Sequence, residues 1–173
     1  MQFSAAIFAT AALVAGVAAD FSTVQSDVQK IQTDVASLYS SLKNTDGTSY
    51  VAALAINSAS QTLNSQIQTA NSDAAAVGSV TDAQAQSLIN TLQATYANVS
   101  AASQRLIALE PAFQKLGIAG IAQSDIKAIQ ASTQTFGATL VAKAPTALKA
   151  SASTLASEYN AALASAAAAY ASA

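Results

Sequence analysis

The sequence has no cysteine and no histidine among its 173 residues, and tryptophan is absent as well. Without cysteine no disulfide can stabilise the fold, so the hydrophobic core must do so alone. Without histidine and cysteine, Ser-His-Asp and Cys-His catalytic arrangements are impossible, and a zinc site loses its two favoured ligands. No motif indicates a serine–lysine pair or a phosphate-binding glycine-rich loop. We therefore expect no catalytic residue, no bound metal and no cofactor.

Charged residues are scarce: they make up 9% of the chain, with seven basic and nine acidic side chains and a net charge of −2. This balance excludes the basic surface that a nucleic-acid partner would require. Three of the charged residues, Asp27, Lys30 and Asp34, share one side of a predicted helix. Acid–base chemistry is one interpretation, but we favour a solvated helix face with weak ion pairs.

Only the N-terminus carries a long apolar run. It extends from Ala5 to Val17 and ends in two small alanines before Asp20. This pattern predicts a cleaved secretory signal peptide over residues 1–19, with an uncleaved helix as the alternative. The run is too short for a comfortable transmembrane segment, and no second one follows. We expect residues 20–173 to form one domain that is secreted, and either free or associated with the cell wall.

The chain is rich in apolar residues that recur in alternating steps of three and four, the spacing of amphipathic helices. The first such series is Phe21, Val24, Val28, Ile31, Val35, Leu38 and Leu42. Comparable patterns predict helices at 22–43, 49–76, 81–110, 111–116, 124–142 and 146–169. The predicted fold is all-α: a single-domain antiparallel bundle of about five long amphipathic helices plus one short helix.

Some local features are less regular. In the second helix we expect Val51, Leu54 and Ser58 to continue the core-facing stripe of Leu63. Pro111 should end the third helix, because it lacks a backbone donor. The apolar segment 118–121 is either a buried loop or a flexible gate at the end of a cavity. The last helix is mostly Ala and Ser beyond its middle, and we expect it to fray after residue 166.

Alanine gives stable helices but little side chain to fill the centre of a five-helix bundle. The helices either move inwards to fill the core or leave an apolar cavity. In the second case we expect twelve residues to line it: Val28, Ile31, Val35, Leu38, Leu92, Tyr96, Val99, Ile129, Phe136, Leu140, Leu155 and Tyr159. Three hydroxyls interrupt the apolar stripes, those of Ser58, Ser103 and Thr133. Each is either bonded to its own helix or a candidate contact for a polar headgroup.

Asn98-Val99-Ser100 is the one N-glycosylation sequon of the chain. By helical phase, Asn98 points away from the apolar stripe of its helix, so it is a possible glycosylation site.

Several of these features together resemble the fungal hydrophobic surface-binding protein A family, which is related to antigenic cell-wall galactomannoproteins. They are the Ala-Ala-Asp end of the signal, the opening helix FSTVQSDVQKI from Phe21 to Ile31, the Asp46-Gly47 turn and the cysteine-free, Ala/Ser/Thr-rich five-helix pattern. Some members carry a Ser/Thr-rich tail and a lipid anchor. The sequence printed here ends without either, which predicts a freely secreted form.

The resemblance implies two related activities. Members adsorb to hydrophobic solids and can help recruit a secreted esterase or cutinase, while related mannoproteins have helical domains that enclose long-chain fatty acids. The implied function is therefore non-enzymatic binding of hydrophobic surfaces, of long-chain fatty acids or other apolar ligands, or of both. The alternative is a cell-wall-associated structural or antigenic mannoprotein with a filled core and no ligand.

Overall fold

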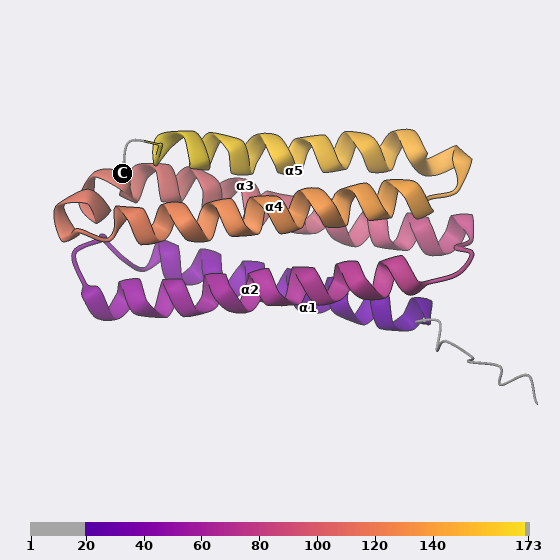
Figure 1. Ribbon diagram of the computed structural model, residues 1–173, viewed down its shortest axis with the longest axis horizontal. Helices are drawn as coiled ribbons and strands as arrows, with labels where there is room; N and C mark the ends of the chain where they lie inside the picture. The colour runs from indigo at the N-terminus through magenta and orange to yellow at the C-terminus, as the bar shows by residue number, and fades with distance from the viewer. Residues whose placement is uncertain (1–19, 172–173) are drawn as a thin grey trace, which may run out of the picture.

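A computed structural model describes residues 20–171 of the chain. The predicted signal peptide lies outside these residues. The helices are α1 (Phe21–Lys43), α2 (Tyr50–Ala76), α3 (Asp82–Leu116), α4 (Ala119–Lys143) and α5 (Lys149–Ala169), with a 3-10 turn, η1 (Thr146–Leu148), before α5. The described residues contain no strand, and the predicted all-α bundle of five long helices is confirmed (Figure 1).

Polar residues at the helix starts explain several of the boundaries. The Asp20 carboxylate accepts a hydrogen bond from the backbone N–H of Ser22 at the start of α1. At the start of α3, the Thr81 hydroxyl accepts from the backbone N–H of Gln84, whose side chain accepts in return from the N–H of Thr81. This reciprocal arrangement is a capping box.

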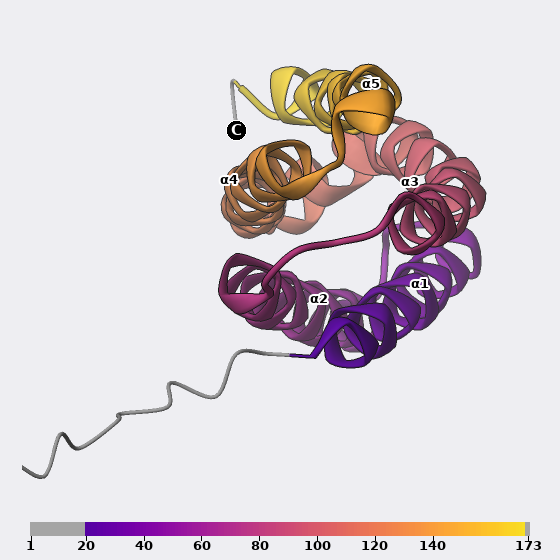
Figure 2. The same cartoon turned by 90° about the vertical axis from the view of Figure 1, so that its right-hand side faces the viewer.

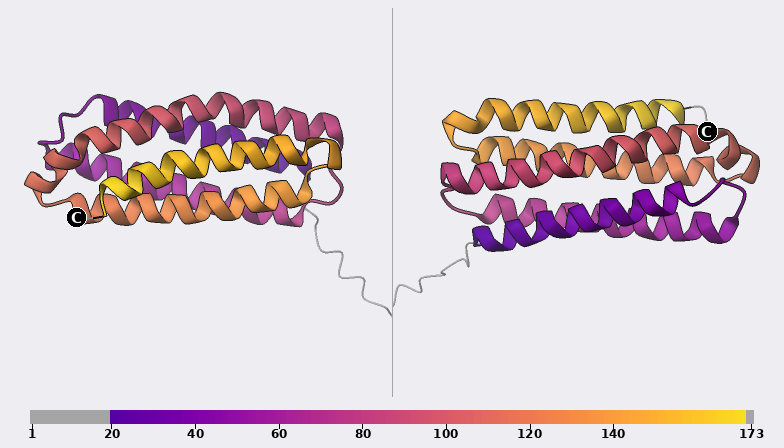
Figure 3. Two further views of the ribbon diagram at one scale, coloured as in Figure 1. Left: turned by 90° about the horizontal axis from the view of Figure 1, so that it is seen from above. Right: turned by 180° about the vertical axis from the view of Figure 1, so that it is seen from behind.

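The five helices form a closed ring in the order α1, α2, α4, α5, α3 (Figure 2). Successive helices run in opposite directions along the bundle (Figure 3). The short connections do not make all successive helices neighbours, however. The connection from α2 to α3 crosses one end of the ring, and α2 packs on α1 and α4 instead. A closed ring of this kind surrounds its own axis, which is where the site described below lies.

A polar seam joins α2 to α4. Three of its four side-chain hydrogen bonds recur at a regular spacing: Asn57 Nδ2 to Asp125 Oδ2 at 2.9 Å, Ser132 Oγ to Asn64 Oδ1 at 2.7 Å, and Thr139 Oγ1 to Asn71 Oδ1 at 2.7 Å. The partners advance by seven residues on both helices. Equal steps in the same direction mean that α2 and α4 are parallel and in register, because seven residues bring a helix back to nearly the same face.

The expected break at Pro111 is wrong, since α3 continues through it to Leu116. Pro111 is exposed, so water can replace the hydrogen bond that the Ile107 carbonyl loses. Leu109 and Phe113, on either side, are both buried in the core. Their burial favours a helix that continues. The predicted short helix at 111–116 is therefore the last part of α3, and the short element of the described residues is η1. Most of segment 118–121, expected to be a loop or a gate, belongs to the first turn of α4.

The predicted stripe is also wrong in the first half of α2. Val51 and Leu54 are 79% and 69% exposed, and Ser58 is exposed too. Leu54 precedes the buried Leu63 by nine residues, which at 3.6 residues per turn is half a turn out of phase. The positions in phase with Leu63 are Ile56 and Ser60, and both are buried.

The C-terminal end of α5 is anchored, contrary to the expected fraying beyond residue 166. Tyr170 is fully buried, and its hydroxyl donates a hydrogen bond of 2.8 Å to the carbonyl of Leu106 on α3. The side-chain amide of Gln123 on α4 donates to the carbonyl of Tyr170. One large aromatic side chain thus supplies the packing that the preceding alanines lack.

Asp27 lies inside the α1–α2 interface and not on a solvated face. It is 4% exposed; its Oδ1 accepts a 3.0 Å hydrogen bond from Gln66 Nε2, while its Oδ2 has no partner among the described residues. Burial raises the pKa of Asp27 above its ordinary value of 3.8, and the neighbouring Asp73 carboxyl raises it further. The ionised side chain is therefore disfavoured in the folded protein.

Replacing Asp27 by asparagine is expected to stabilise the protein at neutral pH. Because the folded state holds this proton more tightly than the unfolded state, stability falls as pH rises from 3.8 through the higher pKa of the folded state. Asp27→Asn should raise the melting temperature at neutral pH by roughly 2–4 °C, the shift that about 1 kcal/mol produces at this size. Thermal unfolding followed by circular dichroism across the acid range measures both effects.

Asp46→Asn is the control with the opposite sign. The Asp46 carboxylate accepts hydrogen bonds from the backbone N–H and the hydroxyl of Thr48, which hold its pKa below the ordinary value. Its loss should lower stability at neutral pH. A fall in melting temperature for both variants would contradict our account of Asp27.

Candidate functional site

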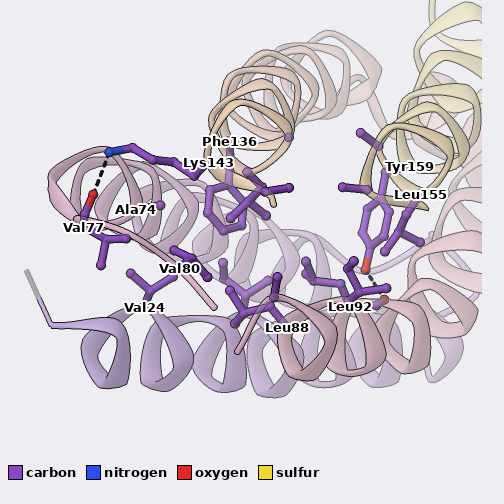
Figure 4. Close-up of a pocket in the computed structure, with 18 of the residues that line it drawn as sticks. Val24, Ala74, Val77, Val80, Leu88, Leu92, Phe136, Lys143, Leu155 and Tyr159 are labelled. Carbon is purple, nitrogen blue, oxygen red and sulfur yellow. Dashed lines mark hydrogen bonds between the residues drawn. The ribbon is translucent and has the colours of Figure 1, made fainter. Parts of the chain in front are cut away.

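An apolar cavity of about 90 Å³ lies inside one half of the helix ring (Figure 4). All five helices contribute to it, together with the connection from α2 to α3. Its lining comprises Phe21, Val24, Ile31, Ile67, Ala74, Val77, Val80, Ala85, Leu88, Ile89, Leu92, Thr133, Phe136, Gly137, Leu140, Lys143, Ala144, Ala152, Leu155, Ala156 and Tyr159. On α4 alone the lining extends from Thr133 to Lys143, which corresponds to about 15 Å along a helix.

Small residues account for the empty space. Ala74, Ala85 and Ala152 are buried and line the cavity, each with a single methyl group. Gly137 lies against α5, where a Cβ atom added to it would be 3.2 Å from Cβ of Ala156. The helices α4 and α5 thus approach each other closely at Gly137, and this contact fixes one wall of the cavity.

The structure brings six of the twelve predicted lining residues to the cavity: Ile31, Leu92, Phe136, Leu140, Leu155 and Tyr159. The other six do not line it. Of these, Val28, Val35, Leu38, Val99 and Ile129 are buried in the packed core, and Tyr96 is half-buried with its ring 5.4 Å from that of Tyr159. The cavity therefore occupies one part of the bundle axis, and these other apolar side chains are buried outside it.

Of the three residues whose hydroxyls were candidate headgroup contacts, one lines the cavity and two do not. Thr133 is half-buried and lines the cavity. Ser103 is buried away from the cavity, and Ser58 is exposed on α2. Asn98, the residue of the sequon, is half-buried on α3.

Lys143 also lines the cavity, although the apolar pattern of the sequence did not predict it. It is half-buried at the end of α4, and its ammonium donates a 2.6 Å hydrogen bond to the carbonyl of Val77, the residue that follows α2 and caps its C-terminus. The three-and-four stripe reaches this position: Lys143 is three residues beyond Leu140. Patterns of apolar residues alone pass over a lysine whose stem continues the stripe.

Tyr159 is the other polar group that Figure 4 labels in the cavity wall. Its hydroxyl donates a 2.6 Å hydrogen bond to the carbonyl of Leu92 (Figure 4). Burial raises the pKa of Tyr159 well above its ordinary value of 10.0. The phenol therefore stays neutral, and it presents mainly its apolar ring to the cavity.

The opposite end of the bundle carries exposed apolar side chains. Tyr50, Val51 and Leu54 lie at the start of α2 and Ile121 at the start of the parallel α4, with exposed fractions of 53–79%. The α2–α4 register pairs residues 68 apart, so Ile121 lies at the level of Ala53, the residue before Leu54. We call these four residues the apolar end patch.

The described residues include no cluster of three or more side chains suited to a metal ion. Over residues 20–171, every helix is too short or too polar to cross a membrane.

Several solved structures share this architecture. Afmp4p in complex with palmitic acid has a TM-score of 0.83 and 26% sequence identity, over 87% of this chain and 99% of that chain. The ligand binding domain 2 of Penicillium marneffei MP1, complexed with multiple arachidonic acids, has a TM-score of 0.82 and 16% identity, over 89% and 97% of the two chains. The ligand binding domain 1 of the same protein, complexed with arachidonic acids, has a TM-score of 0.81 and 12% identity, over 87% and 99%.

Among curated protein sequences, none matches this chain significantly. The sequence model of one protein family, hydrophobic surface binding protein A, does match, and it covers residues 21–142. These residues include α1, α2, α3 and nearly all of α4, hence most of the cavity wall. The resemblance noted in the sequence is confirmed, and the protein belongs to the hydrophobic surface binding protein A family.

Proposed function

We propose that this protein is a non-enzymatic binder of long-chain fatty acids, whose acyl chain occupies the apolar cavity. The observation that carries the proposal is the cavity itself. A cavity volume of roughly 10–15 Å³ is enough for one water molecule, so this cavity of about 90 Å³ has room for several water molecules. The lining offers few hydrogen-bond partners to water, and such cavities stay dry and accept apolar ligands.

The relatives support the same ligand class. Afmp4p, which shares 26% of its residues with this chain, was solved with palmitic acid. The two Penicillium marneffei domains, solved with arachidonic acids, share the fold at lower identity. An apolar cavity also argues against the alternative of a structural mannoprotein with a filled core, because empty space reduces the packing of the walls.

Titration of the purified protein with a fluorescent fatty acid, followed by displacement with palmitic acid, tests the proposal. Each buried methylene contributes about 0.8 kcal/mol, so about ten of them give roughly 8 kcal/mol and a dissociation constant near micromolar. We expect saturable binding in that range, and a fatty acid in native mass spectra of protein purified from its host. Absence of both would contradict the proposal.

A second candidate function is adsorption to hydrophobic surfaces, as the family's description indicates. The apolar end patch favours it, because several large side chains are exposed together at one end of the bundle. Contact there would not require the cavity to open. The two functions can therefore coexist in one molecule.

The patch predicts a measurable loss of adsorption. The double variant Val51→Ser/Leu54→Ser should bind polystyrene or polyester particles at least tenfold more weakly, because each side chain contributes about 1.5 kcal/mol or more when it is buried. Depletion of the protein from solution measures this effect. Thr62→Ser/Thr69→Ser, at two exposed positions of the same helix, is the control. Equal adsorption by both double variants would exclude the patch as the contact.

The expected location is outside the cell, supported by the predicted signal peptide over residues 1–19. Cell-wall association and recruitment of a secreted esterase or cutinase to a coated surface remain predictions. Co-sedimentation of such an enzyme with particles, with and without this protein, tests the recruitment.

A further inference from the structure

The cavity has a cationic group at one end of an otherwise apolar lining. Lys143 is the only charged residue among those that line it. Among the other charged side chains at this end of the bundle, Asp20, Asp82 and Lys149 are exposed and Asp73, one turn before Val77 on α2, is half-buried; none of the four lines the cavity. A charged side chain in such a position is unusual, since burial next to apolar groups costs solvation.

The ammonium of Lys143 is only partly used. In the described structure it donates one hydrogen bond, to the Val77 carbonyl, although an ammonium group has three donors. The side chain is half-buried, so its stem packs along the cavity while its head remains within reach of water. Figure 4 shows Lys143 and Val77 together at one end of the cavity, with Leu155 and Tyr159 towards the other.

The remaining polar groups of the lining are less suited to an anion. The Tyr159 hydroxyl already donates to the Leu92 carbonyl. Thr133 lies ten residues before Lys143 on α4, about 15 Å deeper along the helix, where a carboxylate would lose its contact with water. Lys143 offers a positive charge, free donors and partial hydration at the same point.

We propose that Lys143 binds the carboxylate of the ligand and so orients the acyl chain, with its methyl end directed towards Thr133 and Tyr159. This inference rests on the fatty-acid-binding function proposed above and extends it to headgroup selection. The site then prefers ionised fatty acids to uncharged lipids of equal chain length. Hydrogen bonds between charged partners are stronger than neutral ones, so the preference should be about tenfold or more.

The test compares palmitate with hexadecanol, which has the same chain length and no charge. The measured quantity is the ratio of their dissociation constants at mildly alkaline pH, where palmitate is ionised. Lys143→Gln removes the charge but keeps a donor for the Val77 carbonyl. We expect it to reduce the preference for palmitate about tenfold, while Lys143→Arg retains it. Lys127→Met, which removes a charge from an exposed position of the same helix, should leave the ratio unchanged.

The outcomes separate the inference from the function on which it rests. If the unmodified protein binds neither ligand, the proposed function itself fails. If it binds both, and Lys143→Gln and Lys143→Met leave the ratio as it was, Lys143 serves only to cap α2 and the inference is overturned. A structural role changes the affinity for both ligands together, whereas headgroup recognition changes only their ratio.

Discussion

Replacing Ala74 by leucine is expected to weaken fatty-acid binding about 50-fold while the protein remains folded. Ala74 lies on α2, is 2% exposed and lines the cavity. The three added carbon atoms would occupy space that we assign to about three methylenes of the ligand. At about 0.8 kcal/mol for each methylene, the loss is roughly 2.4 kcal/mol, which corresponds to the stated factor. Displacement of a fluorescent fatty acid measures it directly.

Ala70→Leu is the matched control, one helical turn earlier on α2. Ala70 is fully buried but does not line the cavity. Leucine there has no space to enter, so it should destabilise the protein by about 1–3 kcal/mol and leave the affinity of the folded protein unchanged. Ala74→Leu should be less destabilising, since it fills an existing void. If the two variants bind fatty acid equally well, the ligand does not occupy this cavity.

Replacing Gly47 by alanine is expected to cause the largest loss of stability among the glycine positions. Gly47 lies in the turn between α1 and α2 with φ of 82°, and a Cβ atom there would be 2.7 Å from Cβ of Ala112 on α3. The left-handed conformation costs a non-glycine residue roughly 1–2 kcal/mol, and overpacking adds about 1–3 kcal/mol. We expect a total loss of roughly 2–5 kcal/mol in the free energy of unfolding, measured by chemical denaturation.

Substitutions at two other glycines distinguish the conformational cost from the cost of overpacking. Gly117 has φ of 76° but no atom within 4 Å of an added Cβ, so Gly117→Ala should lose only the conformational part, roughly 1–2 kcal/mol. Gly78 has neither constraint, and Gly78→Ala should be neutral or stabilise by up to about 1 kcal/mol through the unfolded state. Similar losses at Gly47 and Gly117 would show that α3 yields to the added methyl group.

The neighbourhood of Gly47 explains why the turn matters for the whole bundle. Arg105 on α3 donates hydrogen bonds to the carbonyl of Leu42 at the end of α1 and to that of Thr45 in the turn. These bonds satisfy backbone acceptors that a helix end leaves without partners. Gly47 is needed because α3 approaches the turn closely enough to make them. The turn and α3 therefore depend on one another.

The sequence by itself determined the helices and the class of fold. The three-and-four spacing of Val24, Val28 and Ile31 settles that α1 is amphipathic, and the Thr81–Gln84 capping box marks the start of α3. These are local properties of backbone and side chain. They do not depend on which other helix packs against the segment.

The tertiary structure decided which helix faces pack against one another. Pro111 is tolerated because Leu109 and Phe113 are held in the core, and Asp27 is buried because α2 covers it. Helical periodicity does not identify the partner of a face, so it could not reveal that α2 lies beside α4 or that Val35 and Leu38 are buried away from the cavity. The cavity, and Lys143 at its end, arise where small residues from helices distant in sequence meet around one axis. Such a space depends on the packing of all five helices at once, which no single segment encodes.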